Sequence, residues 1–179
     1  TATQNLMISK VEESKKESIE NLARKNGLWR DVSLIRQNSM ACVAFPSCGL
    51  AMAEAERYLP SLITKIEELA CKHNINETPI TIRMTGCPNG CARPYLAEIA
   101  LVGKALGKYN LYLGGDGKGT RLVQLYKENI SEEIILNELD DLFEKYSLNR
   151  NKKELFGDFL VRQKIVPAVY DGREFKTGL

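Results

Sequence analysis

A predicted strand leads directly into a pair of cysteines in the stretch ITIRMTGCPNGC, residues 80–91. The strand covers Ile80–Met84, a compact segment that follows a proline and is rich in β-formers. The proline and glycine between Cys87 and Cys91 supply the geometry of a turn. The stretch therefore predicts a strand whose end carries two thiols in a turn.

Helices and strands are interleaved on both sides of this stretch. Strands are also predicted at residues 5–8, 99–102, 109–113 and 122–126, and helices at 12–26, 50–72, 132–148 and 155–165. Pro60 lacks an amide N–H and is expected to kink its helix or to begin a second one. Ser131 is the predicted N-cap of the third helix, and residues 28–41 are predicted to be mostly loop. This order predicts an α+β fold, a mixed β-sheet flanked by helices, with residues 1–179 in a single domain.

Length, composition and charge exclude several classes of protein. The chain has 179 residues, 44% hydrophobic and 27% charged, with a net charge of +2. That balance argues against a strongly electrostatic nucleic-acid binder. No apolar run approaches the ~20 residues of a membrane span, and the N-terminal residues lack the blocks of a signal peptide. We therefore expect neither nucleic acid nor membrane as a partner.

The cysteine content points to a reducing compartment. An odd number of cysteines, five, without a secretion signal argues against a disulfide framework and predicts a cytoplasmic protein. Cys71 lies in a helical apolar stripe away from the other four, so we expect it to be a small buried hydrophobe. His73, the only histidine, is expected to be structural or at the surface.

The other four cysteines form two close pairs, Cys42–Cys48 and Cys87–Cys91. Each pair lies in a turn-rich segment just before a predicted helix, and helix N-termini favour thiolates. A tetrahedral zinc site usually has tight spacing in both pairs, which the five-residue gap of the first pair fits poorly. A four-iron cluster is a larger object and tolerates looser spacing. A cluster, a zinc site, and structural or redox cysteines all remain open on spacing alone.

The motifs MAC (40–42) through Cys48 and TGCPNGC (85–91) resemble the two cluster-binding motifs of siroheme-dependent sulfite and nitrite reductases. Further matching segments are AMAEAER (51–57), LAE (96–98), LVGK (101–104), YNL (109–111), LGG (113–115), GTR (119–121), YKENI (126–130) and GDF (157–159). Together they are similar to the C-terminal part of the hemoprotein (beta) subunit of the family's assimilatory, NADPH-dependent sulfite reductases. The resemblance runs from Gln4 to about Pro167.

The resemblance implies the cofactors and the chemistry. Cys42, Cys48, Cys87 and Cys91 would bind a [4Fe–4S] cluster, and Cys91 would share its thiolate with the iron of siroheme. The family reduces sulfite to sulfide with six electrons in sulfate assimilation, which feeds cysteine and methionine biosynthesis. Electrons would come from a flavoprotein (alpha) subunit that carries FAD and FMN and is fed by NADPH.

The resemblance also implies that the chain is a fragment. The family's basic substrate-binding residues lie in the earlier part of the subunit, so we expect no catalytic residue here and no activity of the fragment alone. The N-terminal remainder of the subunit would then be a further partner. Alternatives are a ferredoxin-dependent sulfite or nitrite reductase domain, and a non-catalytic Cys₄ zinc-binding domain.

A glycine-rich loop, GGDGKGTR (114–121), has backbone N–H groups that could converge on an anion. Taken alone it is equally a solvated turn. With the resemblance, Gly115, Thr120 and Arg121 are predicted to bind siroheme carboxylates in a loop that is mobile without them. Arg93 is a further predicted carboxylate partner, and Asn89 is predicted to form the cluster-loop turn and to orient the loop.

Overall fold

The chain forms two compact units in the computed structural model, which describes residues 6–29 and 31–175. The N-terminal unit, Thr1–Val32, contains a short 3₁₀ helix, η1 (Glu13–Lys15), and helix α1 (Lys16–Lys25). The helix predicted at 12–26 is thus confirmed. The strand predicted at 5–8 is wrong for residues 6–8, which are exposed and pair with no strand, while Asn5 lies outside the described residues.

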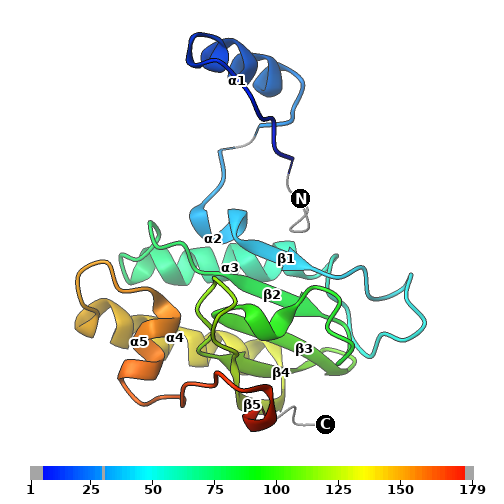
Figure 1. Cartoon of the computed structure of the whole chain (residues 1–179). Coiled ribbons are helices and arrows are strands. Elements are labelled where there is room, and N and C mark those ends of the chain that lie inside the picture. Colours follow the sequence, from blue (N-terminus) through cyan, green and yellow to red (C-terminus); the bar gives the residue numbers. More distant parts are fainter. Residues whose placement is uncertain (1–5, 30, 176–179) are drawn as a thin grey trace. The chain divides into compact units, whose positions relative to one another are not determined.

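The main unit, Ser33–Leu179, is built on a five-stranded mixed sheet with the strand order β1-β2-β3-β4-β5 (Figure 1). The strands are β1 (Ser39–Ala41), β2 (Ile82–Thr85), β3 (Ile99–Ala105), β4 (Lys108–Leu113) and β5 (Gln124–Ile130). β1, β2 and β3 run parallel, whereas β3, β4 and β5 are joined antiparallel. The predicted mixed sheet is confirmed.

Two long helices cover one face of this sheet. They are α3 (Leu59–Lys72) and α4 (Glu132–Asn149), and the other helices are α2 (Leu34–Gln37), α5 (Phe156–Arg162), η2 (Pro94–Leu96) and η3 (Gly172–Glu174). Alternate strand residues such as Met84 and Leu101 pack with the helices in the main core. Their neighbours, such as Ala100 and Val102, belong to a smaller cluster on the opposite face. Among the described residues, no helix is long and apolar enough to cross a membrane.

Local sequence determined most elements, with two corrections. Pro60 lies in the first turn of α3 and starts that helix. The helix predicted at 50–72 is therefore wrong for residues 50–58, which are not helical. Residues 28–41 contain α2 and β1, which are too short to show a periodicity of their own. Ser131 is the N-cap of α4 as predicted, but its side chain makes no capping hydrogen bond.

Candidate functional site

Both cysteine loops leave the sheet at the same edge. Cys42 directly follows β1, and Cys87 comes two residues after β2 ends at Thr85. Because β1 and β2 are parallel neighbours, their carboxyl ends lie side by side. The Cys42 N–H donates to the Met84 carbonyl at 3.1 Å, which extends the strand pairing up to the first cysteine.

Gly86 links the loop of Cys42 and Cys48 to the loop of Cys87 and Cys91 by hydrogen bonds and close packing. Its carbonyl accepts the N–H groups of Met52 (2.7 Å) and Ala53 (3.0 Å), and its own N–H donates to the Cys42 Sγ at 3.3 Å. A Cβ at Gly86 would lie only 2.6 Å from both the Ala44 Cβ and the Ala53 carbonyl oxygen. The first loop therefore rests directly on the backbone that leads into the second cysteine pair.

The four thiols differ in exposure. Cys87 is buried, Cys42 and Cys48 are half-buried, and Cys91 is exposed. Neither pair lies at the start of an α-helix, contrary to prediction. α3 begins only at Leu59, and only the short η2 follows Cys91. In the first loop, the N–H groups of Met52 and Ala53 donate to the Gly86 carbonyl instead of to a helix.

The chemistry of this donor set fits an iron–sulfur cluster. All four thiols are free, and a backbone N–H already donates to the Cys42 sulfur, as N–H groups do to cluster sulfurs. Within residues 6–29 and 31–175, no three His, Cys, Asp or Glu side chains are gathered closely enough to hold a single metal ion. A four-iron cluster is larger than one ion, so its four thiolates surround a wider space.

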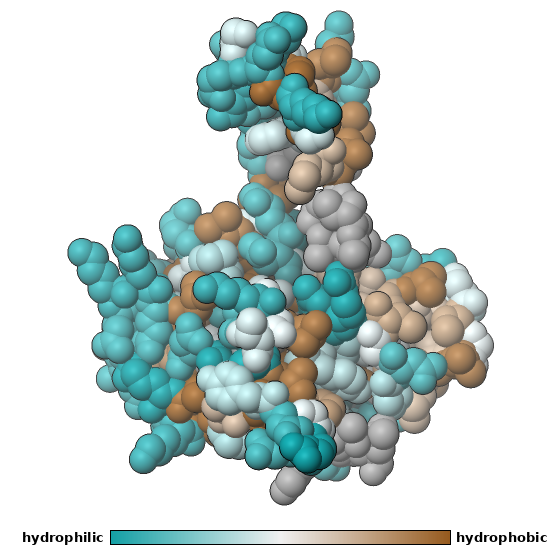
Figure 2. Space-filling model, in the orientation of Figure 1, coloured by the Kyte–Doolittle hydropathy of each residue, from teal (hydrophilic) through white to brown (hydrophobic). Residues whose placement is uncertain are grey.

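The first cysteine loop also exposes apolar side chains. Val43, Leu50 and Met52 are 50%, 70% and 41% exposed. Figure 2 shows hydrophobic residues at the edge of the main unit where Figure 1 places this loop. Such an apolar patch next to the thiols is typical of a surface that contacts another apolar body.

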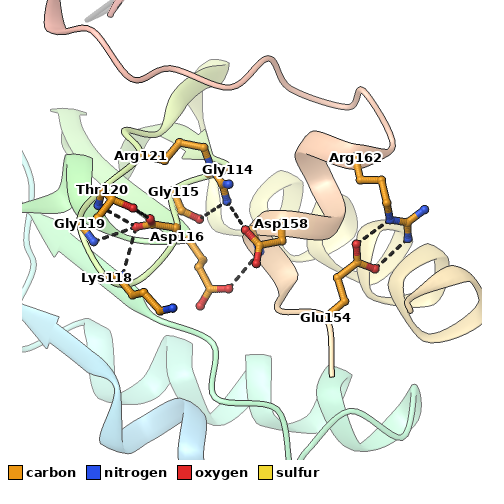
Figure 3. A network of polar contacts seen from close by, with 12 residues as sticks. Gly114, Gly115, Asp116, Lys118, Gly119, Thr120, Arg121, Glu154, Asp158 and Arg162 are labelled. Atoms are coloured by element: carbon orange, nitrogen blue, oxygen red, sulfur yellow. Dashed lines mark hydrogen bonds and ion pairs between the residues drawn. The ribbon is translucent and has the colours of Figure 1, made fainter. Parts of the chain in front are cut away.

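The glycine-rich loop holds an anion of its own. The Asp116 carboxylate accepts the N–H groups of Lys118 (3.1 Å), Gly119 (2.7 Å) and Thr120 (3.1 Å), and also the Thr120 hydroxyl (Figure 3). Burial alone would raise the pKa of Asp116, but these hydrogen bonds outweigh it and the pKa is lowered. The converging N–H groups thus bind a carboxylate from within the loop.

Arg121 is likewise held inside the chain. Its guanidinium donates to the carbonyls of Gly114 (2.7 Å) and Gly115 (3.4 Å) and to the Asp158 carboxylate (2.7 Å), and the residue is 7% exposed (Figure 3). Burial alone would lower the pKa of Arg121, but its hydrogen bonds to Asp158 and Tyr170, together with the attraction of these two groups, outweigh burial, and the pKa is raised. Arg121 therefore connects the loop to α5. Its role toward siroheme carboxylates, like those of Gly115 and Thr120, stays a prediction.

A buried carboxylate that sequence reasoning missed completes this connection. Glu98 is 1% exposed and accepts the N–H groups of Thr81 (2.8 Å) and Gly157 (3.0 Å). Burial raises its pKa, and these two hydrogen bonds only partly counteract that effect. No local signal marks Glu98 in the sequence, because its partners lie 17 and 59 residues away.

The structure brings Cys42 next to the backbone that leads into Cys87, but it does not bring the glycine-rich loop to these two cysteines. The Gly114 N–H donates to the Glu98 carbonyl, just before β3 begins. The glycine-rich loop therefore lies at the amino end of β3, whereas Cys42 and Cys87 follow the carboxyl ends of β1 and β2. The chain between Cys91 and Glu98 connects these two regions.

Asn89 and Arg93 lie in that connecting region. Asn89 is exposed and occupies a turn, as predicted. Arg93 is half-buried with left-handed backbone (φ 53°), and its carbonyl accepts the Arg83 guanidinium at 3.2 Å. Pairing of Arg93 with a siroheme carboxylate stays a prediction.

Cys71 and His73 lie near the end of α3. Cys71 is exposed, so the prediction of a buried thiol is wrong. The buried face of α3 includes Ala70, and the next residue is turned about 100° away from it. His73 is structural as predicted, because its Nε2 lies 2.7 Å from the Asp140 carboxylate of α4.

Replacing Arg121 with alanine is expected to destabilise the main unit by about 1–3 kcal/mol, since buried acceptors lose their donor. Urea unfolding followed by circular dichroism measures this change. Arg173→Ala is the control, because Arg173 is 90% exposed in its pair with Asp171 and should leave the midpoint unchanged. Equal midpoints for both variants would show that the buried contacts of Arg121 contribute nothing.

The comparisons with known proteins point to one enzyme subunit. No family model matches the chain. The chain is 58% identical over 178 residues to the sulfite reductase (NADPH) hemoprotein beta-component of Staphylococcus carnosus, covering 98% of this chain and 31% of that protein. The subunit of the same name from Zymomonas mobilis is 54% identical over 171 residues, covering 96% of this chain and 30% of that protein.

A solved structure supports the fold. The structure of the Mycobacterium tuberculosis NirA protein matches with a TM-score of 0.66 at 21% identity, over 85% of this chain and 30% of that one. This likeness supports the mixed sheet with its helices. At 58% identity over 98% of its length, the chain is similar to one part of the sulfite reductase (NADPH) hemoprotein beta-component, and it spans 31% of the length of that relative.

Proposed function

We propose that this chain is the cluster-holding part of a sulfite reductase hemoprotein. Cys42, Cys48, Cys87 and Cys91 hold a [4Fe–4S] cluster. The observation that carries the proposal is the locking of the two cysteine loops at one sheet edge by Gly86, with an N–H group donating to the Cys42 sulfur. The names of the relatives support the same conclusion.

Each thiol has its own place in this proposal. Cys42, Cys48 and Cys87 are the buried and half-buried ligands, which their own loops shield from water. Cys91 is exposed, so its thiolate is the one that siroheme can reach from outside the main unit. When bound, the two cofactors would pass on the electrons with which sulfite is reduced to sulfide. The exposed apolar residues of the first loop keep water away from the joined cofactors.

The remaining parts of the reaction lie outside this chain in our proposal. The rest of the hemoprotein supplies siroheme contacts and the basic residues that bind sulfite. A flavoprotein with FAD and FMN, reduced by NADPH, delivers the electrons, in keeping with the words NADPH and beta-component in the names of the relatives.

Anaerobic reconstitution with iron and sulfide tests the proposal. We expect about four iron and four sulfide per chain, with a broad visible absorption shoulder that bleaches on reduction. Reconstitution with zinc in place of iron is the parallel experiment. Tight binding of one zinc ion, with no stable loading of iron and sulfide, would contradict the proposal.

The chain on its own is expected not to reduce sulfite, even after its cluster is loaded. The basic substrate-binding residues lie in the rest of the hemoprotein under our proposal. Sulfide production with reduced methyl viologen as the donor is the measurement. Sustained turnover by the 179-residue chain would contradict this division of the enzyme.

A further inference from the structure

Thr85 carries a hydroxyl without a partner inside the protein. The residue is 0% exposed. Its Oγ1 is the buried side-chain polar atom, within the described part of the chain, that makes no hydrogen bond. Native proteins rarely leave such a group unpaired, because its burial costs free energy that no contact returns. A hydroxyl in this position therefore calls for a partner that the polypeptide itself does not provide.

The position of Thr85 indicates which partner it serves. Thr85 is the last residue of β2, and Gly86 and Cys87 follow it. Next to it, the Cys42 N–H bonds the Met84 carbonyl, and the Gly86 N–H donates to the Cys42 Sγ. Thr85 thus lies between a cysteine of the first pair and a cysteine of the second.

The side chain of Thr85 lies on the face of β2 that is opposite to the helix-covered core. Side chains alternate along a strand, so Thr85 shares the face of Arg83 and not that of Met84. Arg83 donates to the Arg93 carbonyl at 3.2 Å, which shows that the chain following Cys91 covers this face. Met84 belongs to the helix-covered core on the other side. Thr85 therefore lies on the face of β2 that the chain after Cys91 approaches at Arg83.

We propose that the Thr85 hydroxyl donates a hydrogen bond to a sulfur atom of the cluster and thereby favours its reduced state. This inference rests on the proposed function. Reduction adds negative charge to the cluster, and a donor to sulfur stabilises that charge more in the reduced form than in the oxidised form. Sulfur accepts the hydroxyl hydrogen without requiring water in the site. The Gly86 N–H and the Thr85 hydroxyl then form two adjacent donors at the cluster.

Two variants of the full chain test the inference. Thr85→Val has nearly the same shape and lacks the hydroxyl, whereas Thr85→Ser keeps it. After reconstitution, all three proteins should contain the same iron and sulfide. The midpoint potential, from a redox titration followed by absorption and electron paramagnetic resonance, should become more negative in Thr85→Val. We expect about a tenfold change in the reduction equilibrium, or about 59 mV for one electron. Thr85→Ser should stay at the wild-type potential.

The cofactor-free proteins provide the second measurement. Without a cluster the hydroxyl has no partner to lose, so Thr85→Val should unfold at the same urea concentration as wild type or at a higher one. A clearly less stable Thr85→Val would mean that the hydroxyl already bonds an ordered water, and it would overturn the inference. Equal potentials in wild type and Thr85→Val would overturn it as well, while a loaded wild-type cluster leaves the proposed function intact. Failure of the wild-type chain to load a cluster would overturn both.

Discussion

Replacing Cys87 with serine is expected to reduce the iron retained after reconstitution to the background level. Cys87 is 8% exposed and lies directly beyond the Gly86 lock, so no other thiol can take its place without moving both loops. A serine hydroxyl stays protonated near neutral pH, whereas a thiolate is the ligand that iron requires. Iron and sulfide analysis after gel filtration, together with the absorption spectrum, measures the loss.

The control for this experiment is Cys71→Ser. Cys71 is exposed on α3 and should leave loading unchanged. Serine at Cys42, Cys48 or Cys91 should act as serine at Cys87 does, because each removes one of four ligands. The circular dichroism spectrum of each variant should match that of the wild type, since serine is close to cysteine in size. Equal loss of iron in Cys71→Ser would refute the assignment of the ligands.

Alanine at Gly86 is expected to disrupt the site and to destabilise the main unit. The added Cβ would meet the Ala44 Cβ and the Ala53 carbonyl oxygen, both at 2.6 Å. On the other side, Gly86 packs against Gly103, where a Cβ would lie 2.4 Å from the Gly86 carbonyl oxygen. The backbone at Gly86 therefore cannot move away from Ala44 without meeting β3. Overpacking of this kind costs about 1–3 kcal/mol or more. Separation of the loops should also move Cys42 away from Cys87 and abolish cluster loading.

Gly49→Ala is the matched control in the same loop. A Cβ at Gly49 meets nothing within 4 Å, so both loading and unfolding should stay close to wild type. Urea unfolding and iron content are measured for both variants side by side. If Gly86→Ala loads a full cluster, the contact at Gly86 does not position the cysteines, and our account of the site fails.

The glycine-rich loop illustrates where sequence reasoning stops. Its composition predicts N–H groups converging on an anion, and the structure contains that convergence. The carboxylate that occupies it comes from Asp116 of the loop itself, and the guanidinium of Arg121 turns inward to Asp158. Whether a donor serves a ligand or its own chain depends on three-dimensional distance, which residue types do not encode locally.

The sequence by itself determined most of the regular elements and the candidate ligands. Apolar spacing placed α3 and α4, compact β-rich runs placed β2, β3 and β4, and the two cysteine pairs marked the site. These features depend on neighbours within a few residues, so a linear pattern contains them. Only the tertiary structure decided which residues, distant in the sequence, are in contact. Gly86 packs closely between Ala44 and Gly103. The Glu98 carboxylate accepts the N–H groups of Thr81 and Gly157. The Thr85 hydroxyl is buried without a hydrogen-bond partner. Each of these contacts joins residues far apart in the chain, and each arises only when the whole core has packed.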